Sequence, residues 1–120
     1  MNEATVQAKV RLMASQKGWI LWRNNVGVLL DSRGIPVRFG LANDSKLVNK
    51  SYKSADLIGI RPIFITQDMV GTTIGQFVSR ECKHPHWQYN ANDEHEIAQN
   101  RWIELINLLG GDASFTTGEL

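Results

Sequence analysis

The sequence predicts a single α/β domain over residues 1–120, with a mixed central sheet flanked by helices. Apolar residues recur at helical spacing near both ends of the chain, and short apolar segments typical of strands lie between them. A chain of 120 residues is one domain by size. Its apolar fraction of 42% is ordinary for a globular fold and argues against disorder.

The first predicted element is a helix that begins after Asn2 and runs to about Lys17. Asn2 is a favourable capping residue, and Gly18 can end the helix in a left-handed conformation. Glu3 lies on the same side of the helix as the apolar residues, so we expect it near the buried face. The predicted apolar stripe consists of Val6, Val10 and Met13.

A strand and a hairpin are predicted after this helix. Residues 19–22 are apolar and aromatic, as in a strand. Residues 26–30 and 35–39 are two further strand-like runs, and the polar segment 31–34 between them favours a hairpin turn. Residues 42–53 are polar and basic, and we expect a loop there.

The two strands that carry the candidate chemistry are predicted in the middle of the chain. Residues 56–60 form a short central strand, and residues 74–83 form a second. Between them, Thr66 can cap a single helical turn that extends through Val70 and ends at Gly71.

The chain is predicted to end with a helix and a strand. Residues 84–92 are irregular, Asp93 can cap a helix to about Leu109, and residues 113–117 form a last strand. Gln99 flanks the inward face of that helix, where it is either an amide bonded to a loop or a residue beside a functional site. The apolar stripe comprises Ala98, Trp102, Leu105 and Leu109.

Alternation along the second central strand places Glu81 and Lys83 on one face. Asp56 opens the other central strand at the start of an apolar run, where burial of an unpaired carboxylate would be costly. Two carboxylates and an ammonium group suit a divalent cation and the hydrolysis of a phosphodiester. The alternative is a weak ion pair on an exposed strand, where Glu-x-Lys is common.

The ordered set of motifs resembles the VRR-NUC family of the PD-(D/E)XK nuclease superfamily, and more closely its small stand-alone phage and bacterial proteins. The resemblance covers nearly the whole chain and departs from the pattern at Cys82, where an aliphatic residue is expected. The matching stretches are Trp22–Gly27, Arg38–Leu41, Ser54–Gly59, Glu81–Lys83, and Gln99 before Leu108–Ala113.

The resemblance implies a single nuclease domain with a restriction-endonuclease-like core and a DNA endonuclease activity that depends on Mg²⁺ or Mn²⁺. Asp56, Glu81 and the backbone carbonyl of Cys82 would bind the metal. Lys83 would orient or deprotonate water, or stabilise the phosphate charge. Glu3 would complete the site, and Gln99 would position Lys83 or a DNA phosphate. A homodimer and a preference for branched, flap or junction DNA are further expectations.

The charge distribution favours nucleic-acid contact by the first half of the chain. Residues 9–61 contain ten Lys or Arg against three Asp, and such a surface suits a phosphate backbone. The alternative is a solvated surface with uneven charge. Asn24 and Asn25, which follow a predicted strand, also favour a tight bend. The candidate DNA-binding residues are Arg23, Asn24, Asn25, Arg38, Lys46 and Lys53.

Other chemistries have weaker support. His84, His86 and His95 lack the spacing of a zinc site, and Cys82 lacks a recognisable base for nucleophilic catalysis. Of the tryptophans at positions 19, 22, 87 and 102, only Trp87 lies in a polar segment, where it could stack on a base. The other three are expected in the core.

The composition also bounds location and competing functions. One cysteine fits a reducing compartment, no apolar stretch is long enough to span a bilayer, and the first residues lack a signal-peptide pattern. We therefore expect the cytoplasm of a bacterium or of a phage-infected host, and no membrane partner. A non-catalytic nucleic-acid-binding module and a phage accessory interaction protein are the competing functions.

Overall fold

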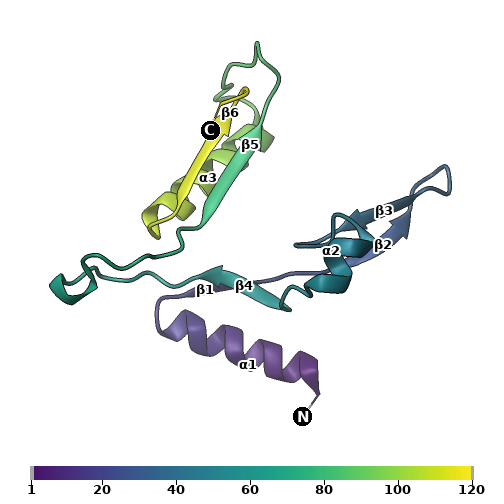
Figure 1. The fold of residues 1–120 in the computed structure, drawn as a ribbon. Coiled ribbons are helices and arrows are strands. Elements are labelled where there is room, and N and C mark those ends of the chain that lie inside the picture. The colour runs from purple at the N-terminus through teal and green to yellow at the C-terminus, as the bar shows by residue number, and fades with distance from the viewer. Residues whose placement is uncertain (1, 120) are drawn as a thin grey trace. The chain divides into compact units, whose positions relative to one another are not determined.

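The computed structural model describes residues 2–119, which form three α-helices, one 3-10 turn and six strands in three two-stranded sheets (Figure 1). The mixed α/β character agrees with the sequence prediction. The chain divides into two compact units, residues 1–59 and 60–120, and each unit is described by itself. The described strands pair two by two, whereas the sequence predicted one central sheet. Alternation of apolar residues identifies strands but does not identify their partners, so the sheet arrangement could not be predicted from it.

Helix α1 (Glu3–Gln16) of the first unit has the predicted boundaries. The Asn2 side chain accepts a hydrogen bond from the Thr5 N–H at 2.8 Å, and Gly18 has a φ of +80° just after the helix. The expected burial of the apolar stripe is wrong for its named residues: all three are 40–47% exposed, and Glu3 is also exposed. Ala14, four residues after Val10 and on the same side of the helix, is the buried residue of α1, and the helix contacts strand β1.

Strand β1 (Ile20–Arg23) pairs with strand β4 (Leu57–Ile60), and this pairing requires a glycine in β4. A Cβ atom at Gly59 would lie 1.8 Å from the Ile20 carbonyl oxygen, far inside van der Waals contact. The hydrogen bond from Asn24 N–H to the Asp56 carbonyl, at 2.8 Å, continues this pairing beyond the strand ends. Trp19 and Trp22, expected in the core, are half-buried.

Strands β2 (Gly27–Leu30) and β3 (Pro36–Phe39) form the predicted antiparallel hairpin. Asp31 fixes the turn, because its Oδ1 atom accepts hydrogen bonds from the N–H groups of Arg33 at 2.8 Å and Ile35 at 2.9 Å. Gly34 supplies the positive φ of +77° that the turn requires. The hairpin prediction is therefore confirmed.

A short helix, α2 (Lys46–Ser51), lies in the segment predicted to be a loop, so that prediction is wrong. Ser45 starts the helix: its Oγ atom accepts a hydrogen bond from the Val48 N–H at 3.2 Å. The sequence of α2 has no apolar stripe that would indicate a helix, because all its residues are solvent-exposed or half-buried. The capping residue Ser45 is therefore the main local helix signal in this segment.

The second unit starts with an extended segment that contains the predicted single turn, η1 (Gln67–Met69), followed by Gly71 with a φ of +88°. Strand β5 (Val78–Cys82) is shorter than the predicted strand 74–83. Residues 84–92 contain no helix or strand, as predicted. Among the described residues, none of the helices in either unit has the length and apolar character needed to cross a bilayer.

Helix α3 (Glu94–Leu108) and strand β6 (Asp112–Thr116) complete this unit, close to the predicted bounds. The Asp93 carboxylate caps the helix by accepting from the N–H groups of His95 and Glu96, at 2.9 and 3.1 Å. Strands β5 and β6 are parallel, and parallel neighbours need a crossover connection such as α3. Figure 1 shows α3 lying along this pair of strands.

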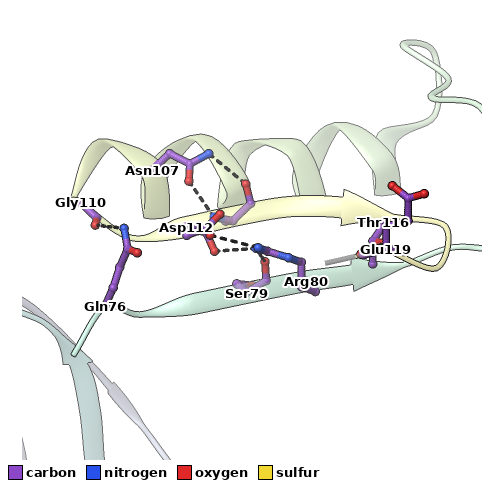
Figure 2. A network of polar contacts seen from close by, with 9 residues as sticks. Gln76, Ser79, Arg80, Asn107, Gly110, Asp112, Thr116 and Glu119 are labelled. Atoms are coloured by element: carbon purple, nitrogen blue, oxygen red, sulfur yellow. Dashed lines mark hydrogen bonds and ion pairs between the residues drawn. The ribbon is translucent and has the colours of Figure 1, made fainter. Parts of the chain in front are cut away.

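The core of the second unit lies between α3 and the β5–β6 pair. Ile106 is fully buried, and Ile103 and Ala113 are nearly so. Trp102, expected in the core, is 37% exposed, and its indole N–H donates to Ser79 Oγ at 2.9 Å. Polar contacts join α3, β5 and β6 (Figure 2). The Asn107 side-chain amide donates to the Ala113 carbonyl and accepts from the Ala113 N–H. The Arg80 guanidinium pairs with the Asp112 carboxylate at 3.1 Å.

Candidate functional site

Three polar side chains predicted to act together meet on the side of β5 that faces α3. The Gln99 Oε1 atom accepts a hydrogen bond from Lys83 Nζ at 2.8 Å, and Gln99 Nε2 donates to Glu81 Oε1 at 2.7 Å. The orientation of the amide follows from its partners, since an ammonium only donates and a carboxylate only accepts. The shared face of Glu81 and Lys83, inferred from strand alternation, is therefore found in the structure.

The register of α3 brings Gln99 to these strand residues. The helix begins at its Asp93 cap, and residues three and four apart share one side of a helix. Gln99 thus lies on the same side as Ile103 and Ile106, which are buried against the strands. The same packing that forms the core delivers the amide to Glu81 and Lys83, so the predicted inward flank of Gln99 is confirmed.

A pocket of about 260 Å³ opens beside this group. His95 contributes to it, and His95 Nε2 lies 3.2 Å from Gln99 Nε2. Because the amide nitrogen is a donor, this contact is a hydrogen bond in the His95 tautomer whose Nε2 carries no proton. Sequence reasoning missed His95 as a neighbour of Gln99, although a spacing of four residues on a helix signals a shared side. The lining residues are Glu81, His95, Ala98, Gln99 and Trp102.

The Lys83 ammonium also borders an aromatic cluster. Its Nζ atom lies 5.6 Å from the ring centroid of Trp87 and 5.8 Å from that of Phe115. These distances are within the range in which a cation is attracted to the face of an aromatic ring. Lys83 is half-buried, and its ammonium group has Gln99 and the two aromatic rings as neighbours.

The other two predicted site acids, Asp56 and Glu3, belong to the first unit, and both are exposed. Exposure removes the argument that Asp56 is a costly buried carboxylate, although its backbone is well fixed. The Asn24 Nδ2 atom donates to Ser54 Oγ at 2.8 Å and to the Ala55 carbonyl at 2.9 Å, immediately before Asp56. A meeting of these two acids with Glu81 stays a prediction.

Two of the predicted DNA-binding residues make internal hydrogen bonds. Besides Asn24, whose amide holds the segment before Asp56, Arg38 donates to the carbonyl and the side-chain oxygen of Asn43 at 2.8 and 2.7 Å. Asn43 is 2% exposed and donates to backbone carbonyls of both hairpin strands. Arg38 therefore helps to fix the hairpin to the following loop.

The remaining predicted DNA-binding residues lie at the surface. Lys53 donates to the Asn49 side chain, and the other three are exposed: Arg23, Asn25 and Lys46. The charge asymmetry follows the division of the chain. Residues 1–59 contain nine Lys or Arg against four acids, and residues 60–120 contain four against eight.

The Glu81 carboxylate supplies oxygen atoms, the donor type that a hard divalent cation prefers. Mg²⁺ is often held by one or two carboxylates and retains several waters, so a dense cluster of ligands is not required. Among residues 2–119 no group of three or more His, Cys, Asp or Glu side chains is arranged to hold a metal. The structure gives no support to a zinc site at His84, because its Nδ1 atom accepts a hydrogen bond from the backbone N–H of His86 at 3.2 Å.

Comparisons with models of protein families, with curated proteins and with solved structures found no match. The chemistry of Glu81, Lys83 and Gln99 is therefore the basis for assigning a function.

Proposed function

We propose that this protein is a divalent-metal-dependent DNA endonuclease. The observation that supports the proposal best is the double hydrogen bond of Gln99, which joins a carboxylate and an ammonium group on one face of β5. A simple surface ion pair between Glu81 and Lys83 would not require a third residue from another element. An amide that donates to one and accepts from the other holds both side chains in fixed positions.

Each residue has a role in this proposal. Glu81 would hold Mg²⁺ or Mn²⁺, together with the backbone carbonyl of Cys82; Asp56 enters as a further ligand from the family resemblance alone. When bound, such an ion supplies an activated water and neutralises phosphate charge. Lys83 stabilises the negative charge that develops on the phosphate, and Gln99 keeps its ammonium in place.

DNA is the proposed partner, and the first unit is the proposed approach surface. Its excess of basic residues, with Arg23 and Lys46 exposed, suits a phosphate backbone. This charge asymmetry also favours the second candidate function, a non-catalytic nucleic-acid-binding module. The two candidates differ in the requirement for Glu81 and Lys83, which a binding module would not need.

The proposal includes a preference for branched, flap or junction DNA and a homodimer that presents two sites to two strands. One assay tests it: incubation with branched, nicked and linear DNA of the same sequence, with Mg²⁺, with Mn²⁺ and with a chelator. Metal-dependent cleavage with the branched substrates cut fastest is expected. Binding to all three without cleavage under any condition would favour the binding module.

A further inference from the structure

The Lys83 ammonium lies where an amide and two aromatic rings meet. Gln99 accepts its hydrogen bond at 2.8 Å, and the centroids of Trp87 and Phe115 are 5.6 and 5.8 Å away. The two rings contact each other, with centroids 4.7 Å apart and planes inclined by 37°. Lysine is a flexible side chain with three rotatable donors, so the rings and the amide together restrict it to one position.

Trp87 is itself held by a buried acid. Its Nε1–H donates to Glu96 Oε1 at 2.6 Å, and Glu96 is only 8% exposed. A buried carboxylate is costly without a partner, so this hydrogen bond is a stabilising contact of α3. Trp87 belongs to the segment 84–92, which has no helix or strand, and the bond fixes this irregular segment to the helix.

Two of the three contacts to Lys83 depend on residues from one side of α3. Glu96 and Gln99 are three residues apart and therefore share a helix face. Gln99 reaches Lys83 directly, and Glu96 reaches it through the Trp87 ring. The helix thus determines where the ammonium lies by two independent routes.

We propose that Trp87 and Glu96 are positioning residues that fix the Lys83 ammonium against Gln99, next to Glu81. The inference rests on the proposed nuclease function for its effect on rate, whereas the placement of Lys83 can be measured without any cleavage. Trp87 contributes its ring face to Lys83, and Glu96 contributes the acceptor that orients the ring. Neither residue needs to touch the substrate.

Four variants separate these contributions, with one control. Trp87→Leu removes the ring, and Trp87→Phe keeps a ring but loses the N–H donor. Glu96→Ala removes the acceptor, while Glu96→Gln keeps an oxygen that can accept from the indole. Tyr89→Leu is the control, because Tyr89 packs on the same rings but has no cation–ring contact with Lys83 among residues 2–119.

The first readout is the nuclear magnetic resonance shift of the Lys83 ε-protons. Protons held over aromatic faces move upfield, so we expect an upfield position in the wild type, Tyr89→Leu and Glu96→Gln. Trp87→Leu and Glu96→Ala should move the signal toward that of a solvated lysine, and Trp87→Phe should lie between. A wild-type signal at the solvated-lysine position would overturn the inference.

The second readout is steady-state cleavage of DNA. Trp87→Leu and Glu96→Ala should lower kcat on the order of tenfold, the factor that corresponds to a cation–ring contact, with KM unchanged. Glu96→Gln should restore most of the rate lost in Glu96→Ala, and Tyr89→Leu should cleave normally. Wild-type kcat in both disruptive variants would refute the positioning role. If the wild type does not cleave, the nuclease function fails, and the proton shift still decides whether Trp87 places Lys83.

Discussion

Gln99 Oε1 accepts a hydrogen bond from Lys83 Nζ at 2.8 Å, although 16 residues separate the two in the chain. The contact joins the end of β5 to the second turn of α3. Its partner bond, from Gln99 Nε2 to Glu81 Oε1, uses the other half of the same amide. The Gln99 side chain therefore hydrogen-bonds both the Glu81 carboxylate and the Lys83 ammonium, which makes Gln99 the most informative position for substitution.

Gln99→Leu should keep the helix and remove both hydrogen bonds. We expect a loss of about 2 kcal/mol in the free energy of unfolding, because two hydrogen bonds are lost and each contributes about 1 kcal/mol net. Cleavage should also fall, on the order of tenfold or more, because the ammonium loses its fixed position. Asn100→Ala on the same helix, which removes only an exposed bond to Glu104, is the matched control and should cleave normally.

Metal binding should stabilise the folded protein. A ligand that binds only the native state raises the melting temperature by mass action. We therefore expect a higher Tm in millimolar Mg²⁺ or Mn²⁺, measured by differential scanning fluorimetry, and no increase in Glu81→Gln. A rise of the same size in Glu81→Gln would place the bound metal elsewhere.

The affinity for DNA should depend steeply on salt, and its slope should report which basic residues contact phosphates. Arg23→Gln or Lys46→Gln should each reduce the slope of log K against log salt by about one, as expected for one lost phosphate contact. Arg38→Gln should act differently, since its guanidinium bonds Asn43: it should lower Tm as well. A normal Tm in Arg38→Gln would show that its internal bonds contribute little.

The hairpin should loosen in acid. The hydrogen bond from the Ile35 N–H lowers the pKa of Asp31 below its ordinary value, with further contributions from Arg33. A carboxylate with a lower pKa in the folded state stabilises that state above its unfolded pKa, and this stabilisation is lost as pH falls through the folded value. The protection factors of the hairpin amides, which are relative to the intrinsic exchange rate at each pH, should therefore fall at low pH in the wild type. Asp31→Asn, which can still accept the bonds but does not titrate, should lose this part of the pH dependence.

Much of the local structure could be predicted from the sequence because its signals are local. Asn2 and Asp93 cap the two long helices, and both helices extend over nearly the predicted residues. The hairpin followed from the turn at Asp31, and the common face of Glu81 and Lys83 followed from strand alternation. Each of these features depends on residues only a few positions apart.

The features that could not be predicted depend on contacts between distant residues. Strand partners, the burial of Ala14 but not of Val6 and Val10 on the same side of α1, and the internal hydrogen bonds of Arg38 all require the folded arrangement. The contacts of Lys83 with Gln99, Trp87 and Phe115 are another case. The sequence marks Trp87 as a possible base-stacking residue, but its hydrogen bond to Glu96 cannot be inferred from composition or periodicity.

Single-turnover cleavage of a labelled branched DNA in Mn²⁺ by the wild type and three variants tests the central claim most directly. Asp56→Asn and Glu81→Gln should remove most cleavage while retaining the fold, because they remove charge and keep shape. Lys83→Ala should slow the chemical step on the order of a hundredfold or more while DNA binding persists. Wild-type rates in Glu81→Gln and Lys83→Ala would contradict the assignment of this site as a nuclease centre.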